Sequence, residues 1–115
     1  MARKQSKPQD RLVLLHPRAS EDLDEIYLHT TLHWGIIQAE RYTAFLHERM
    51  LEVANSSLLD RPLADRPGLF VCFVRWKRSR YCHNIIYQRN EQGISVLRIL
   101  HSAMDLPAHV DGGSE

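Results

Sequence analysis

The first thirty-five residues show two apolar patterns, a short continuous run and a longer one with helical spacing. The run at 11–15 is apolar after its first residue, and its length favours a buried strand. Pro17 suits the first position of a helix, and Gly35 suits the end of one. Between them an apolar stripe recurs at steps of three and four: Leu23, Ile26, Thr30 and Trp34. The pattern predicts a strand over 11–15 and a helix over 17–34.

The start of this helix has two candidate capping residues. His16 occupies the N-cap position if the helix begins at Pro17, although histidine is a poorer cap than Ser, Thr, Asp or Asn. Ser20 is a competing start. An acidic cluster follows, and the helix macrodipole offers a structural explanation for it: Glu21, Asp22, Asp24 and Glu25.

A second helical stripe follows Gly35 and ends near Asn55. Its apolar positions are spaced by three or four residues: Ala39, Tyr42, Leu46, Met50 and Val53. Two helices joined by so short a connection must be antiparallel neighbours. The sequence therefore predicts a helical hairpin with one shared apolar side, which needs a sheet or a partner to cover it.

The second half of the chain reads as a loop followed by strands. The stretch 56–68 contains two prolines and predicts a loop with at most one helical turn. Residues 69–76, 81–89 and 94–101 are rich in strand formers and are separated by two polar breaks. We predict an α+β fold, in which an N-terminal strand and an antiparallel helical hairpin pack on an antiparallel β-sheet meander. The hairpin covers one sheet face, and the other face is a candidate binding surface.

The length of 115 residues is that of one domain. We expect residues 1–10 to form a flexible arm, 11–110 the single domain and 111–115 a flexible tail. No run of 18 apolar residues and no signal-peptide pattern is found, which favours a cytoplasmic protein without a membrane segment. Cys72 and Cys82 match no metal-ligand or redox spacing, so we expect two buried thiols.

The net charge of +1 conceals an uneven distribution. No acidic residue lies between Asp65 and Glu91, where six basic residues give +6, so the rest of the chain carries −5. Arginine outnumbers lysine twelve to three, and its planar fork suits carboxylates and phosphates. A polyanionic target or an acidic partner is one interpretation. The other is a solvated, arginine-rich hairpin with no ligand.

Candidate chemistry concentrates in the predicted meander. Arginines, tyrosines and histidines there are the equipment of metal-independent RNA cleavage: Arg75, Arg80, Tyr81, His83, Tyr87, Arg98 and His101. Tyr87 and His101 are explained equally well as core residues bonded to the backbone. His29 and His33 have the spacing of a metal-binding pair, but no third ligand is evident. No phosphate-binding glycine loop is present, and we expect no cofactor, no metal and no small-molecule ligand.

The order strand, helical hairpin, loop and meander resembles the ParE branch of the RelE/ParE toxin superfamily over about residues 11–110. Particular residues carry the resemblance: Pro17, Ala19, Asp22, Leu23 and Ile26; Trp34-Gly35 with Ala39 and Tyr42; Pro67-Gly68-Leu69; Ile86-Tyr87 with Arg89; and Leu97-Arg98-Ile99-Leu100-His101 with Met104-Asp105. The resemblance implies the toxin of a type II toxin–antitoxin (plasmid stabilisation) system. It also implies a toxin–antitoxin hetero-oligomer with a small ParD-like antitoxin, whose C-terminal segment wraps the toxin.

The resemblance leaves the target open, because ParE-like toxins poison DNA gyrase whereas RelE-like relatives cut messenger RNA on the ribosome. Many relatives carry an arginine after the final histidine, where this chain has Ser102, Ala103 and Met104, and its tail has no Arg, Lys or Tyr. This departure favours a non-enzymatic gyrase inhibitor over an endoribonuclease. A third hypothesis is an inactive toxin that only binds a partner. We expect target or antitoxin binding by Arg75, Arg78, Arg80, Tyr81, Tyr87, Arg89, Arg98, His101, Met104 and Asp105.

Overall fold

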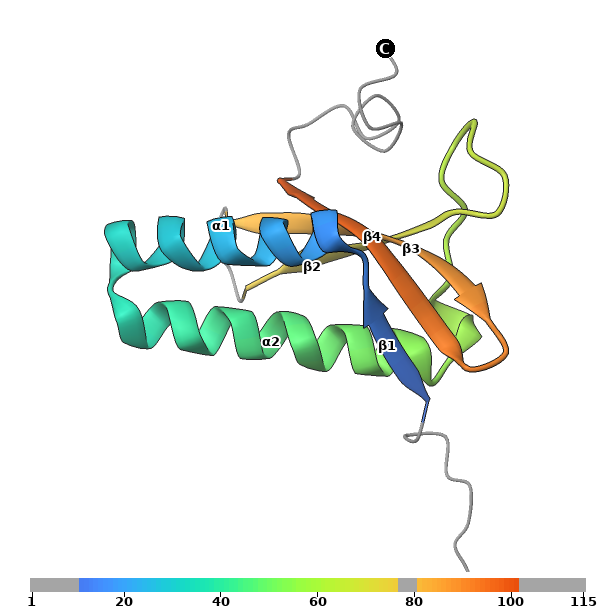
Figure 1. Cartoon of the computed structure of the whole chain (residues 1–115), viewed down its shortest axis with the longest axis horizontal. Coiled ribbons are helices and arrows are strands. Elements are labelled where there is room, and N and C mark those ends of the chain that lie inside the picture. Colours follow the sequence, from blue (N-terminus) through green and yellow to red (C-terminus); the bar gives the residue numbers. More distant parts are fainter. Residues whose placement is uncertain (1–10, 77–80, 102–115) are drawn as a thin grey trace, which may run out of the picture.

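The structure is a computed structural model that describes residues 11–76 and 81–101. Two long helices lie antiparallel on one side of a twisted four-stranded sheet (Figure 1). The elements in chain order are β1 (Leu12–Leu15), α1 (Pro17–Trp34), α2 (Ile36–Ala54), the short 3₁₀ helix η2 (Ser57–Leu59), β2 (Phe70–Arg75), β3 (Cys82–Asn90) and β4 (Gly93–His101). The predicted strand, helical hairpin, loop and meander are all confirmed, with bounds that agree within a few residues.

The N-terminus of α1 confirms His16 as the cap, and Ser20 is not the start. The Nδ1 atom of His16 accepts a hydrogen bond from the Arg18 backbone N–H at 3.1 Å, and Pro17 occupies the first turn. One orphan donor of the helix is thereby satisfied by an imidazole, which takes the role that Ser or Asp usually fills. A helix that begins at Pro17 places the acidic residues beyond its first turn.

A single residue, Gly35, joins the two helices. Its φ of +93° lies in the region that favours glycine, as the sequence predicts for this turn. The Gly35 backbone N–H donates to the Thr31 carbonyl at 2.9 Å, and its own carbonyl accepts from Ala39 at 3.1 Å. The reversal is therefore immediate, and it places the last turn of α1 beside the first turn of α2.

The sheet is mixed. It contains a parallel strand pair, which the predicted antiparallel meander does not include. Its strand order is β1-β4-β3-β2, and β1 pairs in parallel with β4 while the other pairs are antiparallel. Gly93 allows this pairing, because a Cβ atom there would lie 1.9 Å from the Leu12 carbonyl oxygen. Asn90 shapes the preceding turn by accepting hydrogen bonds from the backbone N–H groups of Gln92 and Gly93.

The core has two parts, one on each face of the sheet. The larger part lies between the helices and the sheet and contains the fully buried Tyr42, Leu46 and Met50. The smaller part is formed by side chains on the opposite face of β3 and β4. Leu63 and Leu69, from the segment between η2 and β2, pack against them. This segment covers part of the sheet face that the sequence predicted to be an open binding surface. β3 is accordingly buried from Cys82 to Tyr87.

Other sequence predictions can be compared directly with the described residues. Cys72 and Cys82 are buried free thiols, as expected. Trp34 does not belong to the buried stripe of α1, since it is 55% exposed. Neither long helix has the length and apolarity needed to cross a membrane, within the residues described. The predicted arm, the 77–80 break and the tail lie outside the described residues.

Candidate functional site

Two adjacent cavities open where β2 ends, β3 begins and β4 ends. The larger one, which we call the aromatic pocket, has a volume of about 330 Å³. Its described lining comes from both helices and three strand ends: His29, Thr30, Trp34, Gln38, Trp76, Tyr81 and His101. A neighbouring cavity of about 230 Å³ shares His29, Tyr81 and His101 with it. The tip of the helical hairpin and one end of the sheet therefore form a single hollowed region.

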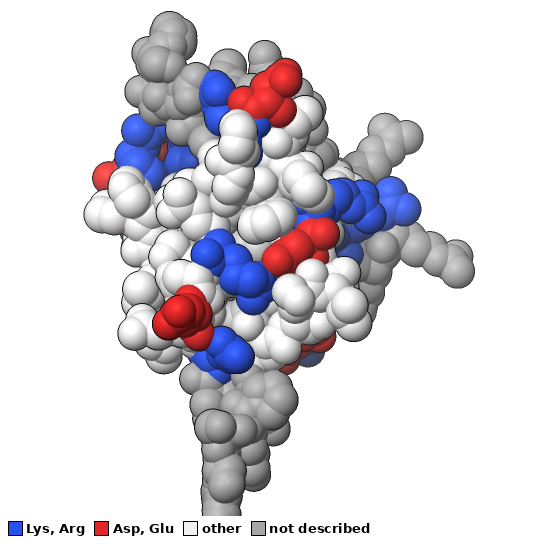
Figure 2. All heavy atoms as spheres, turned by 90° about the vertical axis from the view of Figure 1, so that its right-hand side faces the viewer, with Lys and Arg blue, Asp and Glu red and all other residues white. Residues whose placement is uncertain are grey.

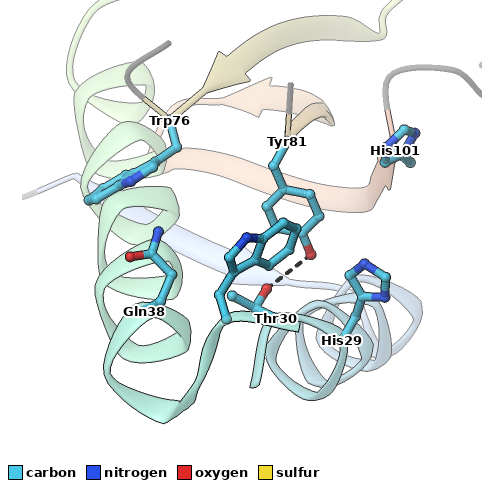
Figure 3. A pocket seen from close by; sticks show the side chains of 7 residues that line it. His29, Thr30, Gln38, Trp76, Tyr81 and His101 are labelled. Atoms are coloured by element: carbon cyan, nitrogen blue, oxygen red, sulfur yellow. Dashed lines mark hydrogen bonds between the residues drawn. The ribbon is translucent and has the colours of Figure 1, made fainter. Parts of the chain in front are cut away.

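Tyr81 lies at the centre of the aromatic pocket (Figure 3). Its hydroxyl is hydrogen-bonded to the Thr30 hydroxyl at 3.0 Å, and its ring lies 5.1 Å from Trp34 and 4.9 Å from Tyr42. His29 stacks on the ring from α1 at 5.7 Å. Burial raises the pKa of the Tyr81 phenol, and the Thr30 hydrogen bond opposes that shift only in part. The phenol therefore keeps its proton at neutral pH.

His83 and Tyr42 form a buried pair beneath the pocket. The Tyr42 hydroxyl and the His83 Nδ1 atom are 2.8 Å apart, and His83 is only 4% exposed. Burial is the main cause that lowers the pKa of His83 to about 4; the nearby His101 and His29 contribute to this shift, and Asp22 opposes it. Burial raises the pKa of Tyr42. An imidazole with a pKa of about 4 is a weak base near pH 7, and a phenol with a raised pKa is a weak acid there, so this pair serves the core better than acid–base chemistry.

Arg98 is committed to an ion pair with Asp22. Its Nε and Nη2 atoms donate to the two carboxylate oxygens at 2.8 and 3.0 Å, and the Ile99 backbone N–H adds a third bond at 2.8 Å. The Asp22 hydrogen bonds raise the pKa of Arg98. Asp22 thus joins α1 to β4, and the explanation of this residue through the helix dipole is wrong. Arg98 is thus held within the fold, and it also lines the neighbouring 230 Å³ cavity, so its role in binding stays a prediction.

Arg89 and Tyr87 are likewise held by one carboxylate, that of Asp60. Arg89 donates to Asp60 at 2.7 Å through Nε and through Nη2, and the Tyr87 hydroxyl donates to it at 2.6 Å. Arg89 also donates to the Val53 and Ala54 carbonyls at 2.6 and 3.2 Å. These bonds satisfy carbonyl oxygens at the C-terminal end of α2. Burial would raise the pKa of Asp60, but the bonds from Arg89 and Tyr87 outweigh it and lower that pKa. We call these three residues the Asp60 clamp.

The basic window between Asp65 and Glu91 is therefore not a set of six free charges. Arg89 is neutralised within the Asp60 clamp, while Arg75 is exposed on β2. On the face drawn in Figure 2, basic side chains lie in separate groups, and acidic side chains touch several of them. Among the residues that the structure describes, that face shows no continuous patch of one sign.

The structure brings together only part of the predicted binding set. Tyr81 and His101 line the aromatic pocket, whereas Arg75 is exposed on β2 and is not among the lining residues, because successive side chains of a strand point to opposite faces. Tyr87, Arg89 and Arg98 make internal contacts, although Arg98 also lines the neighbouring cavity. Tyr87 is a buried core residue, as the alternative states, but its hydroxyl bonds the Asp60 carboxylate and not the backbone. Arg78, Arg80, Met104 and Asp105 lie outside the described residues.

Sequence reasoning missed five lining residues. The spacing of His29 and His33 indicates only exposed helical histidines or a metal-binding pair, and no group of three or more His, Cys, Asp or Glu side chains converges as a metal site among residues 11–76 and 81–101. Trp34 was assigned to the core stripe, and Thr30, Gln38 and Trp76 were not considered for binding. One signal was available, because Trp34 lies next to Gly35, where a helix end exposes its last side chain.

The fold and its site define a class: a small α+β protein with a helical hairpin on a mixed sheet and an aromatic pocket at one end. A family model described as ParE toxin of type II toxin–antitoxin system, parDE, matches residues 13–106. The chain belongs to this ParE toxin family, and the resemblance found in the sequence is confirmed.

Individual relatives agree with the family assignment. Toxin ParE1 of Mycobacterium tuberculosis (strain CDC 1551 / Oshkosh) is 34% identical over 95 residues, which is 81% of this chain and 91% of the relative. Toxin ParE1 of Caulobacter vibrioides is 26% identical over 97 residues, 84% of this chain and 94% of the relative. A chain of the chromosomal ParDE TA system from P. aeruginosa has a TM-score of 0.61 at 23% identity, covering 81% of this chain and 97% of that one. This structural likeness supports the fold.

Proposed function

We propose that this toxin inhibits DNA gyrase by binding it, and that a small ParD-like antitoxin neutralises the toxin in a hetero-oligomer. The observation that carries the proposal is the ParE family match over residues 13–106. The aromatic pocket is the target-binding site of the proposal, and the exposed Arg75 at the end of β2 is a second proposed contact.

The internal contacts support binding over RNA cleavage. Acid–base catalysis near neutral pH needs side chains that can exchange protons with a substrate. Tyr87 and Arg98 make hydrogen bonds to Asp60 and Asp22, and His83 is buried with a pKa of about 4. Three of the residues on which the nuclease hypothesis draws thus make their contacts inside the protein. The sequence departure at Ser102–Met104 points the same way.

A supercoiling assay tests the target. Purified protein should inhibit supercoiling by gyrase or trap gyrase–DNA cleavage complexes, and it should leave ribosome-bound messenger intact. The matched variants are Arg75→Glu, which reverses an exposed charge at the end of β2, and Arg61→Glu, which reverses an exposed charge in the segment between η2 and β2. We expect Arg75→Glu to weaken inhibition and Arg61→Glu to leave it unchanged.

Two results would contradict the proposal. Codon-phased cuts in a translating extract, without an effect on gyrase, would establish the endoribonuclease hypothesis instead. Normal growth of a bacterial host despite soluble expression of the toxin alone would favour an inactive, partner-binding protein. Slow growth and filamentation, rescued by the gene that encodes the antitoxin, are the expected outcome.

A further inference from the structure

Both tryptophans of the chain line the aromatic pocket. Trp34 and Trp76 are the only tryptophans in the sequence, and each contributes to the wall of the 330 Å³ cavity. Trp34 is 55% exposed, and the neighbouring Ile36 and Ile37 are 55% and 65% exposed. Large apolar side chains gathered at a surface mark binding sites more often than folding requirements. The pocket is therefore a candidate ligand site in its own right.

The walls of the pocket are aromatic rings whose orientations are fixed from behind. Tyr81 is held by its hydrogen bond to Thr30 and presents one platform, on which His29 stacks with an interplanar angle of 24°. Trp76 is held by edge contacts to Phe45 at 4.9 Å and Tyr42 at 6.1 Å. Such preformed, flat walls suit a flat ring, because little conformational freedom is lost when the ring stacks on them.

Polar groups are placed among these rings. The Gln38 side chain lines the pocket, and its amide offers one acceptor and two donors. In Figure 3, Gln38 and Trp76 lie on one side of Tyr81, while His29 and His101 lie on the other. A side-chain amide can form paired hydrogen bonds with the edge of a base. The pocket thus combines stacking surfaces with a group able to read a ring edge.

From this arrangement we infer that the aromatic pocket binds a nucleobase, stacked against its rings with the Gln38 amide at the base edge. An apolar side chain from a protein partner would fill the cavity but offer the Gln38 amide no hydrogen-bond partner. A base provides both a π-face and hydrogen-bonding edges, and unstacked bases are commonly bound on aromatic side chains. The inference does not depend on gyrase as the target.

The two tryptophans provide a direct test by NMR. The ¹H–¹⁵N spectrum contains two side-chain indole signals, and both report on this pocket. The probes are adenosine, deoxyadenosine, octamers of dA, dT and rA, and N-acetyltryptophanamide as a substitute for a protein side chain. We expect nucleosides and octamers to shift the indole signals, with octamers binding more tightly because their phosphates add affinity. The dA and rA arms identify DNA or RNA as the source of the base.

Three variants separate the contributions. Trp34→Ala should weaken octamer binding about tenfold or more, since base–aromatic stacking is lost at an exposed position that the fold tolerates. Phe73→Ala removes another exposed aromatic ring, on β2, and should leave binding unchanged. Gln38→Leu should retain binding but remove the difference between dA and dT octamers. Circular dichroism confirms that each variant is folded.

Three outcomes would overturn the inference. Absence of any indole shift with octamers at about 1 mM would exclude a nucleobase site, since even non-specific nucleic-acid binding is stronger than this. Shifts with N-acetyltryptophanamide but not with nucleosides would assign the pocket to a protein side chain. Equal weakening by Trp34→Ala and Phe73→Ala would show that binding is not at the pocket. A gyrase result of either sign changes none of these readouts, so the two proposals fail separately.

Discussion

The two ends of β3 place similar residues in opposite situations. Arg89 and Tyr87, near its C-terminal end, belong to the Asp60 clamp, where every hydrogen bond closes the fold upon itself. Tyr81 precedes the other end and faces a cavity, beside an exposed tryptophan and two histidines. Residue type alone therefore does not distinguish scaffold from binding site. The difference lies in the partners: the Asp60 carboxylate holds Arg89 and Tyr87, whereas the Thr30 hydroxyl holds Tyr81.

The largest expected effect lies at the Asp60 clamp. Arg89→Ala should lower the free energy of unfolding by about 3 kcal/mol, because the Asp60 carboxylate, 12% exposed, would remain buried without its ion-pair partner. Urea denaturation followed by circular dichroism measures the change. Arg61→Ala removes an exposed arginine nearby and should stay within about 0.5 kcal/mol of the wild type. A loss for Arg89→Ala no larger than that of the control would show that the clamp is not a scaffold.

A second prediction concerns pH and the buried His83. The pKa of His83 is about 4 in the folded protein, whereas its ordinary value is 6.5. Between these two pH values the unfolded chain binds a proton at His83 and the folded chain does not. Stability should therefore fall by about 3 kcal/mol as the pH drops from 6.5 to 4. The lowered pKa of Asp60 acts in a separate, more acidic window, where its stabilisation is lost as the carboxylate is protonated.

Denaturation curves at several pH values measure this dependence. His83→Gln should flatten the curve between pH 6.5 and 4, because the residue that faces Tyr42, Tyr81, His101 and His29 no longer titrates. His33→Gln, at an exposed position of α1, is the control and should keep the wild-type slope. An identical slope in wild type and His83→Gln would refute the assignment.

A third prediction addresses Arg78 and Arg80, in the sequence that joins Trp76 to Tyr81. If these charges steer the antitoxin, Arg78→Glu with Arg80→Glu should reduce its association rate by about one to two orders of magnitude at low ionic strength. The control doublet, Arg18→Glu with Arg41→Glu, changes the net charge equally at exposed positions of α1 and α2. Stopped-flow association measures both. An equal effect of the two doublets would mean that net charge, and not this sequence, governs the rate.

The smallest expected effect is on the stability of the pocket end. Trp34→Ala should change the free energy of unfolding by less than about 0.5–1 kcal/mol, since the side chain is more than half exposed. Thermal unfolding compared with that of Arg89→Ala places the two ends on one scale. A loss for Trp34→Ala as large as that for Arg89→Ala would remove the distinction between scaffold and binding surface.

Much of this fold can be predicted from local patterns, and the failures have a common cause. Helical spacing, Pro17 and Gly35 set the bounds of α1, because these signals act within a few residues. The parallel pairing of β1 with β4 joins residues about eighty positions apart, and no local pattern encodes it. The Arg98–Asp22 pair spans 76 positions for the same reason.

The candidate site was harder to predict than the fold. Arginine and tyrosine composition identified a region, and Tyr81 and His101 do line the aromatic pocket. Composition could not show that Arg89 and Tyr87 are both hydrogen-bonded to Asp60. The same apolar spacing that places Leu23 and Ile26 in the core predicted burial for Trp34, but α1 ends where Trp34 passes the edge of the sheet. These contacts and this exposure depend on the tertiary structure, which the spacing of apolar residues does not reveal.

Inhibition of gyrase supercoiling by matched aromatic variants tests the central claim most directly. Trp34 and Phe73 are both exposed, at 55% and 48%, but only Trp34 lines the aromatic pocket. The claim that the pocket end carries the binding function predicts that Trp34→Ala needs about tenfold more protein for half-inhibition, with unchanged thermal stability, whereas Phe73→Ala matches the wild type. Full inhibition by Trp34→Ala, or an equal loss in both variants, would contradict it.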